Sequence, residues 1–572
     1  MPATATIIGL GPRGLGLLER FAALAGDDAD AIEVHVVDPT CAGAGVHVTD
    51  QPDYLLMHCP GSDLTMFPDS ASLDGEPERA GFTFFEWARD TGVLVEERAV
   101  APTDFLPRSL FGRYLQWFRE RVEAAARGRV RIVFHRDVAV DARDEPGGRI
   151  VVVCGSGAEI SSDFLCVAVG YGQVSTQALP FPLPAGLDDI PAGARIGLSG
   201  FGLTSLDIVS HLTVGRGGTF RTAGAGLEYV PSGSEPEIVV FSRSGVPARA
   251  RPYRVGVRQE HEPAVLTEKT ARRLADRGTA ALDFEADILP LIETEMRVAY
   301  WRTYDGGRFR EAVDAGDMDA LEDRYGRLDT RALLSGADGM RLDDQRAYES
   351  WACDYIAADL AEAARYPDGS AVKAALEAIE DAFDTIRGII RRQGLTPGSQ
   401  ATFLDVHGPR LRRIAVGPIA ERQAEFLALL RGGVVRAPLG PDPVVDRDGE
   451  RVRLRSRHLS EPYEVEVSTL LNGHIALILL DDTAPELIAN LHARGILRPY
   501  AAAGTVDVDE RLHPRGADGR SHPRIWLLGP ICEGTSFYTH VLPEPGNRSD
   551  CVIDAHRVVT ELLTAARAAG PV

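Results

Sequence analysis

Three glycines near the start of the chain strongly restrict the local fold. The apolar run 4–10 ends around Gly9, and Gly11 and Gly14 follow it. The amphipathic stretch LGLLERFAALAG comes next, and a second apolar run, EVHVV, leads to Asp38. A strand, a glycine turn, a helix and a second strand in this order predict a βαβ unit. In such a unit the first glycine permits a tight turn, the second lets the backbone approach a pyrophosphate, and the third lets the helix pack on the strand.

The residues around this turn also predict a ligand. The helix after the glycines directs unpaired N–H groups and the positive end of its dipole toward bound phosphates. Asp38 lies 24 residues past Gly14, close to the spacing at which an acidic residue binds a ribose hydroxyl. We therefore predict a dinucleotide site; the alternative is a glycine-rich turn from strand to helix that binds nothing.

A second unit of the same kind begins at residue 194. In ARIGLSGFGLTSLDIVSHL, Gly200 and Gly202 keep the first two glycines and Ser205 takes the third place. The next strand, IVVFSRSG, ends in Ser242 and Arg243 instead of an acidic residue. A hydroxyl and a guanidinium suit a ribose 2′-phosphate, which favours NADPH over NADH. The alternative is a solvated arginine in a turn.

The segments that follow the two glycine turns resemble each other. Residues 112–172 and 421–474 each show a helix, a strand, a hairpin and a further strand. Between them, residues 256–403 are charged and helical in pattern, with helix candidates at 284–300 and 371–393. The sequence therefore predicts two related doubly wound domains and a helical insert.

A last glycine signal occurs near the C-terminus. PRIWLLGPICEG predicts a short strand that ends at Gly529, a turn that contains Gly534, and a helix whose N-terminus faces a second edge of the cofactor. The expected fold is α/β, with two Rossmann-like dinucleotide-binding domains, the FAD domain being interrupted by the NADPH domain, so that a flavin and a nicotinamide meet across a cleft. The predicted segments are 1–190 (FAD domain, first part), 191–255 (NADPH domain, first part), 256–403 (helical insert), 404–480 (NADPH domain, second part) and 481–572 (FAD domain, last part).

Composition excludes several other classes of protein. The chain has 61 basic and 83 acidic side chains, a net charge of −22, which disfavours nucleic acid or an anionic membrane surface as a partner. Neither of its two lysines, Lys269 and Lys373, stands in the context of a P-loop. Its seven cysteines are scattered without a C-x-x-C pair, so we expect neither a disulfide reductase nor a metal site.

The same features predict where the protein acts. The N-terminus shows neither a basic segment nor an apolar signal core, and no apolar run approaches the ~18 residues of a membrane span. Unpaired cysteines are typical of a reducing compartment. We therefore expect a cytoplasmic protein without a membrane segment, and a homo-oligomer is compatible with the sequence.

Several segments carry a resemblance to a known family. IIGLGPRGLGLLERF, YLLMHCPGSDLTMFPDS, GFTFFEWARD, LPRSLFGRYL, SGFGLTSLD and LLGPICEGTSFYTHVLPEPGNRSD resemble FAD/NAD(P)-binding proteins related to N-hydroxylating flavoprotein monooxygenases. The resemblance covers most of the chain outside 256–400 and is nearest to the nitrosuccinate-forming aspartate N-monooxygenases. It implies FAD in the first domain, NADPH in the second, and hydroxylation of the amino nitrogen of a small amino acid with dioxygen through a peroxyflavin.

The resemblance has two departures, which supply candidate catalytic residues. His58 stands where the family leads us to expect asparagine, and Asp63 where we expect glutamine. A histidine titrates near neutral pH and can act as a proton shuttle; the alternative is a loop histidine that bonds the backbone. His540 and Tyr538, after the last glycine turn, are further candidates, and Glu533 either acts there or caps a helix.

An anionic substrate would need basic residues in this acidic chain. The segment ARARPYRVGVR contains Arg249, Arg251, Arg254 and Arg258, of which we select Arg249 and Arg251 as substrate-binding candidates. Guanidinium groups bind carboxylates in bidentate fashion. The same arginines could instead bind cofactor phosphates or pair with the acidic helices after them.

Other functions share the same cofactor signals. A flavin monooxygenase that inserts oxygen beside a carbonyl, an NADPH oxidase and a redox sensor that binds flavin and NADPH without turnover would all show both glycine turns. Only the resemblance favours N-hydroxylation over these alternatives.

Overall fold

The computed structural model divides the chain into two compact units. Unit 1 comprises Met1–Thr176 and Ala476–Val572, and unit 2 comprises Gln177–Ile475. The structure describes residues 2–25, 32–73, 81–171, 183–184, 186–224, 226–252, 261–304, 317–337, 340–367, 369–391, 394–449, 451–474 and 477–569.

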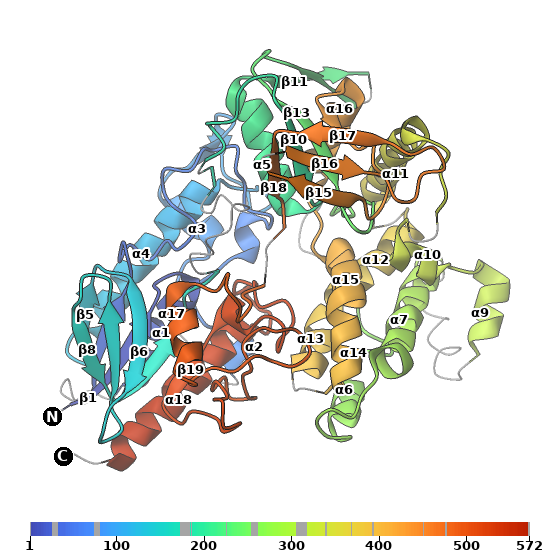
Figure 1. Ribbon diagram of the computed structural model, residues 1–572. Helices are drawn as coiled ribbons and strands as arrows, with labels where there is room; N and C mark the ends of the chain where they lie inside the picture. Colours follow the sequence, from blue (N-terminus) through green and yellow to red (C-terminus); the bar gives the residue numbers. More distant parts are fainter. Residues whose placement is uncertain are drawn as a thin grey trace. The chain divides into compact units, whose positions relative to one another are not determined.

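Unit 1 contains a five-stranded sheet in the order β19-β9-β1-β2-β5, and every neighbouring pair is parallel. Helices pack on this sheet, and all its strands except the edge strand β5 are largely buried and apolar, which is typical of a parallel sheet covered on both faces. Its strands and its three longest helices (Figure 1) are β1 (Ala3–Ile8), β2 (Ile32–Val37), β5 (Arg131–His135), β9 (Phe164–Val167), β19 (Ile525–Leu527), α1 (Pro12–Leu24), α4 (Arg108–Ala126) and α18 (Asp550–Ala569).

Smaller elements complete unit 1. Three antiparallel strands, β6-β7-β8, form a separate sheet, and β3 and β4 form a hairpin. Their bounds, with those of the short helices, are β3 (Leu94–Val95), β4 (Arg98–Ala99), β6 (Ala139–Asp144), β7 (Ile150–Cys154), β8 (Glu159–Ser162), η1 (Gly61–Asp63), α2 (Ser70–Leu73), α3 (Phe84–Asp90), α17 (Glu486–Ala493) and η5 (Gly529–Cys532).

Unit 2 repeats this plan around a four-stranded parallel sheet in the order β14-β13-β10-β18. A three-stranded antiparallel sheet and a hairpin accompany it, as Figure 1 shows in green and orange. The elements are β10 (Arg195–Ser199), α5 (Leu203–Thr213), η2 (Val214–Arg216), β11 (Thr219–Ala223), β12 (Gly226–Val230), β13 (Glu237–Phe241), α16 (Ala420–Gly432), β14 (Val435–Arg436), β15 (Val444–Asp448), β16 (Arg451–Arg455), β17 (Glu464–Val467) and β18 (Thr469–Asn472).

The described part of 261–415 is helical and contains no named strand. The predicted helix at 284–300 begins with one π-helical turn, and the one predicted at 371–393 is divided at Ala382. The elements are α6 (Glu268–Ala275), η3 (Phe284–Ile288), α7 (Leu289–Arg302), α9 (Met318–Tyr325), α10 (Thr330–Ser335), α11 (Gln345–Arg365), α12 (Ala371–Asp381), α13 (Phe383–Arg391), α14 (Pro397–Thr402), η4 (Phe403–His407) and α15 (Gly408–Ala415).

The predicted fold class is confirmed: two parallel α/β sheets, the first unit interrupted by the second, with many additional helices. The five predicted segment boundaries remain predictions. No helix among the described residues is long and apolar enough to cross a bilayer.

The C-terminal segment differs from the prediction in one respect. After β19 the chain forms only the 3₁₀ turn η5, and the next helix, α18, begins at Asp550. The Glu533 carboxylate accepts hydrogen bonds from the backbone N–H groups of Tyr538 and Thr539, and Pro543 has no N–H to give to a helix. The predicted strand and helix are therefore both present, but an irregular segment lies between η5 and the helix.

Candidate active site

The first glycine turn is closed by backbone contacts that exclude any other residue. Gly9 has a φ of +93°, and a Cβ there would lie 2.4 Å from the Ala168 carbonyl oxygen. A Cβ at Gly14 would lie 2.1 Å from the Gly9 carbonyl oxygen. Both distances are far below van der Waals contact, so α1 can pack against the ends of β1 and β9 only because these positions are glycine.

The start of α1 fits a pyrophosphate. Gly11 is the N-cap residue, and no side chain of a described residue caps the helix. A Cβ at Gly11 would meet only the Gly45 Cα, at 3.5 Å. Helix N-termini without a cap leave backbone N–H groups that an anion can bind, and the helix dipole favours negative charge there. This cradle therefore suits the FAD diphosphate.

Asp38 binds the glycine turn itself. One carboxylate oxygen accepts a hydrogen bond from the Leu10 N–H at 3.0 Å, and the other accepts from the N–H groups of Thr40 and Cys41 at 2.9 and 2.8 Å. These bonds tie the end of β2 to the turn after β1. The ribose contact that the sequence suggested for Asp38 remains a prediction.

The second glycine turn uses a serine in place of the third glycine. Ser205 is buried, and its hydroxyl donates to the Gly473 carbonyl oxygen at 3.1 Å. Gly200 has a φ of +130°, and a Cβ there would lie 2.8 Å from the Ser205 Oγ. A Cβ at Gly202, the N-cap of α5, would meet nothing within 4 Å. The N-terminus of α5 is therefore as open to a phosphate as that of α1.

Ser242 and Arg243 lie directly after β13, at the edge of the sheet where the second glycine turn also lies. The Ser242 Oγ accepts from the Gly245 N–H at 3.1 Å. The Arg243 side chain is 65% exposed and forms an ion pair with Asp405. A hydroxyl and an exposed guanidinium are thus present where a ribose 2′-phosphate would bind.

His58 is held by a residue that the sequence analysis did not select. Arg108, the first residue of α4, places its Nη2 2.8 Å from the His58 Nε2 and donates its Nε–H to the Leu56 carbonyl oxygen at 3.1 Å. A guanidinium can only donate, so the His58 Nε2 is the acceptor and the ring proton lies on Nδ1. The sequence did contain a signal for Arg108, which stands in LPRSLFGRYL directly after a proline that precedes a helix.

A second histidine faces the same arginine. The His47 ring packs edge-on against Phe111, with centroids 5.0 Å apart. Burial, together with the Arg108 charge, lowers the pKa of His47 to about 3. Its Nδ1 is buried and has no hydrogen-bond partner among the described residues. His47 is therefore a neutral polar group, and no sequence motif marked it.

Asp63 ends the turn η1 and accepts from the Ser62 hydroxyl at 2.8 Å. Its N–H donates to the Pro60 carbonyl oxygen at 3.0 Å. These contacts place it in the loop that carries His58. A catalytic role for Asp63 remains a prediction.

Three residues distant in sequence meet beyond the sheet of unit 1. The Tyr171 hydroxyl lies 3.3 Å from the His540 Nδ1, and the His540 Nε2 lies 3.9 Å from the Glu533 carboxylate. Burial, with a smaller contribution from Glu533, raises the pKa of Tyr171 to about 12. The phenol therefore stays protonated near neutral pH and can donate to the imidazole. Tyr171 was missed, although it lies four residues after the end of β9, in the sequence GYG.

Gly529 begins the turn η5 and Gly534 follows it, next to the group formed by Tyr171, His540 and Glu533. Gly529 has a φ of +82°, and a Cβ there would lie 3.1 Å from the Arg13 Cγ. The Arg13 guanidinium donates to the Thr539 carbonyl oxygen at 2.7 Å. A Cβ at Gly534 would lie 2.3 Å from the Thr505 Oγ1. Because all strands of the sheet are parallel, this turn lies at the same edge as the first glycine turn, where such sheets bind their ligands.

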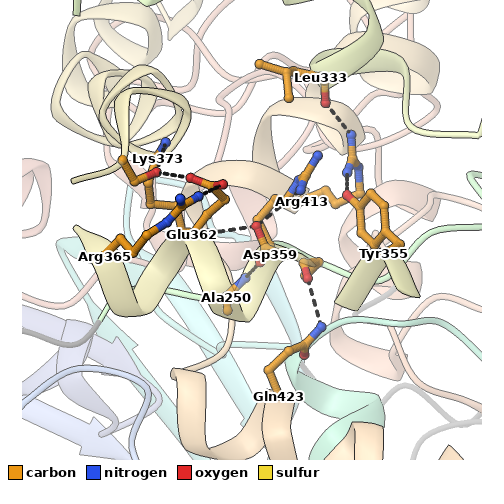
Figure 2. Close-up of polar contacts among 12 residues, drawn as sticks. Ala250, Leu333, Tyr355, Asp359, Glu362, Arg365, Lys373, Arg413 and Gln423 are labelled. Carbon is orange, nitrogen blue, oxygen red and sulfur yellow. Dashed lines mark hydrogen bonds and ion pairs between the residues drawn. The ribbon is translucent and has the colours of Figure 1, made fainter. Parts of the chain in front are cut away.

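Arg249 belongs to a buried charged cluster in unit 2. Its Nη1 lies 3.1 Å from the Asp359 carboxylate, which also accepts from the Lys373 ammonium at 2.9 Å and the Ala250 N–H at 2.6 Å. The Arg249 guanidinium also lies over the Tyr355 ring, 4.4 Å from its centroid. Figure 2 shows Asp359, Lys373 and Tyr355 gathered on neighbouring helices.

Arg413 adds positive charge to this cluster. It is 8% exposed and donates to the Tyr355 hydroxyl at 2.9 Å and to the carbonyl oxygens of Leu333 and Leu334 (Figure 2). Its described partners are neutral, and burial lowers its pKa. The Nε atoms of Arg249 and Arg413 are buried without a hydrogen-bond partner among the described residues.

Three basic groups therefore surround one carboxylate in the cluster that consists of Arg249, Lys373, Arg413 and Asp359. This excess of positive charge suits a further anion.

Arg251 lies outside this cluster and pairs with Glu380 at 2.9 Å. The candidates Arg254 and Arg258 fall outside the described residues. Among the described residues no three histidines, cysteines or acids are placed to hold a metal ion.

Comparison with known proteins agrees with this arrangement. Residues 6–172 match the FAD-NAD(P)-binding family. The nitrosuccinic acid synthase of Aspergillus oryzae is 30% identical over 99% of this chain and 93% of its own length. An L-aspartate N-monooxygenase (nitrosuccinate-forming) of Streptomyces davaonensis is 30% identical over 98% of this chain and 97% of its own. An ornithine N-hydroxylase of Kutzneria sp. 744 aligns over 99% of this chain and its whole length, with 12% identity and a TM-score of 0.47.

The identity over nearly the whole length of both relatives confirms the resemblance seen in the sequence. It also confirms the predicted class of enzyme, a flavin-dependent monooxygenase, and the predicted cofactors, FAD and a nicotinamide dinucleotide. The chain belongs to the family of the nitrosuccinate-forming N-monooxygenases.

Proposed function

We propose that this enzyme hydroxylates the amino nitrogen of L-aspartate, with FAD bound at the first glycine turn and NADPH at the second. The observation that carries the proposal is the identity over nearly the full length of two relatives named for nitrosuccinate formation. The excess of positive charge around Asp359 supports it, because aspartate brings two carboxylates.

The bound flavin supplies the chemistry that the side chains lack: it takes electrons from NADPH and activates dioxygen. The chain must bind the cofactors, hold the amino acid, exclude water and control protons. The open helix N-termini after Gly11 and Gly202 bind the two diphosphates, while Ser242 and Arg243 bind the 2′-phosphate.

We assign His58 the role of a hydrogen-bond donor to the reacting groups. Its Nε2 is engaged by Arg108, so the Nδ1–H is the group that it can offer. His540 is the better base, because the nearby Glu533 carboxylate stabilises the imidazolium, whose Nδ1–H can then donate to the Tyr171 hydroxyl oxygen. A base is required because only an unprotonated amine can attack oxygen.

Arg249 and Arg251 remain our candidates for binding the substrate carboxylates. Each already pairs with an internal carboxylate, Asp359 and Glu380 respectively. A substrate carboxylate would therefore join Arg249 beside Lys373 and Arg413, where basic groups are in excess. None of the seven cysteines forms a disulfide, which supports a reducing compartment such as the cytoplasm.

Replacing Arg108 with methionine is expected to lower kcat at least about ten-fold, because His58 loses the bond that fixes its tautomer. Without the adjacent guanidinium charge, protonation of His58 becomes easier, so the pH profile of kcat should change. Arg108→Lys should restore part of the activity. Arg113→Met, at an exposed position of the same helix, is the matched control. An unchanged pH profile in Arg108→Met would show that the contact is only structural.

The proposed substrate is tested by following NADPH oxidation, hydrogen peroxide and amino-acid products with L-aspartate, L-asparagine and L-ornithine. We expect N-oxygenated product with L-aspartate alone and little hydrogen peroxide. Asparagine lacks the side-chain carboxylate of aspartate, and ornithine has a side-chain cation in its place, which the basic cluster would repel. Electrons recovered entirely as hydrogen peroxide with every amino acid would instead indicate an oxidase, and oxygenation of an added ketone would indicate the carbonyl-oxygenating alternative.

A further inference from the structure

Arg243 forms an ion pair with a residue of the helical segment of unit 2. Its Nη1 bonds the Asp405 Oδ1, and the two side chains are 65% and 69% exposed. Arg243 lies two residues beyond β13 (Glu237–Phe241), at the position where a basic residue accommodates a ribose 2′-phosphate. The Asp405 carboxylate therefore binds the guanidinium that the 2′-phosphate of the coenzyme would contact.

The turn that carries Asp405 is firmly anchored at both ends. Asp405 is the middle residue of the π-helical turn η4 (Phe403–His407), in which Phe403 and His407 are buried. The His407 Nε2 lies 2.9 Å from the Glu285 carboxylate, and its ring packs on Phe284 with centroids 4.9 Å apart. The Asp405 side chain is therefore exposed on a fixed backbone, so it can release Arg243 by rotating while the turn stays in place.

Other basic groups lie beside this pair. His474 follows β18 (Thr469–Asn472) at the same edge of the sheet, and the charges of Arg243 and Arg412 both act on it. The two guanidinium charges would attract a phosphate dianion, whereas the Asp405 carboxylate repels it.

We propose that Asp405 is a specificity-determining residue for the coenzyme, because its carboxylate competes with the ribose 2′-phosphate of NADPH for Arg243. The inference rests on the proposed role of Arg243 in binding NADPH. Binding of NADPH then breaks the ion pair, whereas NADH, which has a hydroxyl at this position, leaves it intact. Asp405 thereby reduces the preference for NADPH that Arg243 creates.

The test is a calorimetric titration of the FAD-loaded full chain with NADP⁺ and with NAD⁺ at fixed ionic strength. Asp405→Asn should lower the Kd for NADP⁺ about three- to ten-fold, the range expected when an exposed ion pair and a like charge are removed. The Kd for NAD⁺ should change less than about 1.5-fold. Unequal effects on the two coenzymes identify the 2′-phosphate as the competing group, because the coenzymes are otherwise alike.

A matched control is Glu268→Gln in α6 (Glu268–Ala275), which also removes one exposed carboxylate paired with an exposed arginine, Arg272. It should leave both Kd values unchanged; if it tightens NADP⁺ binding as much as Asp405→Asn does, net charge explains the effect and the inference is wrong.

Two further variants separate this inference from the proposed function. Arg243→Gln should weaken NADP⁺ binding at least about ten-fold and leave NAD⁺ binding unchanged, and in that background Asp405→Asn should lose most of its effect. If Arg243→Gln does not alter NADP⁺ binding, the role proposed for Arg243 fails. If it does, but Asp405→Asn leaves NADP⁺ binding as it was, Arg243 keeps its role and the competition is disproved.

Discussion

Replacing Gly14 with alanine is expected to yield a protein that does not retain FAD. The new Cβ would lie 2.1 Å from the Gly9 carbonyl oxygen, a backbone atom that cannot move aside without opening the β1–α1 turn. The helix N-terminus would then leave the position at which it binds the diphosphate. The measurement is the flavin absorbance that remains with the protein after gel filtration, and we expect it to be lost along with all NADPH oxidation.

Gly16→Ala provides the matched control on the same helix. A Cβ at Gly16 would make an ordinary contact with the Ala555 Cβ at 3.7 Å, and alanine favours a helix over glycine by about 1 kcal/mol. This variant should keep its flavin and be at least as stable as the wild type. Retention of a full complement of FAD by Gly14→Ala would contradict the proposed cradle.

Asp359→Asn is expected to destabilise unit 2 by about 3–5 kcal/mol, because it leaves the buried Lys373 ammonium and the partly buried Arg249 guanidinium without their carboxylate. Removing one partner of a buried ion pair costs far more than the pair contributes in net terms. We expect the transition of unit 2 in a thermal scan to fall by roughly 5–10 °C.

Glu228→Gln is the control for this prediction. Glu228 pairs with Arg221 in the same unit, but the two side chains are 51% and 65% exposed. Exposed pairs contribute at most about 1 kcal/mol, so the transition should move little. Equal shifts in the two variants would mean that the ion pairs of Asp359 are not the buried interactions that the structure shows.

Local sequence predicted the parts of this fold that depend on local chemistry. Gly9 and Gly200 have a positive φ, and Gly14 lies too close to a backbone oxygen to carry a Cβ. Each of these glycines was evident from its spacing between a strand and a helix. The interruption of the first unit by the second followed from the repeated order of elements. The strand and the helix around the last glycine turn were both predicted, but the sequence did not show how far apart they lie, because Glu533 binds the backbone five and six residues further on.

The contacts within the candidate site depend on tertiary structure, and local patterns could not supply them. Tyr171 and His540 are 369 residues apart in sequence, and they meet because β9 and β19 are neighbours in one sheet. Arg108 could be recognised as the partner of His58 only after the loop before α4 was placed. The sequence marked Arg249 as basic, but its carboxylate partner comes from a helix 110 residues later.

The central claim, N-hydroxylation of aspartate, is tested most directly by mass spectrometry of the product formed from L-aspartate and NADPH under isotopically labelled dioxygen. The account predicts an N-oxygenated derivative of aspartate in which the oxygen on nitrogen comes from the labelled gas. Unchanged aspartate, with NADPH consumed and the label found only in hydrogen peroxide, would contradict it.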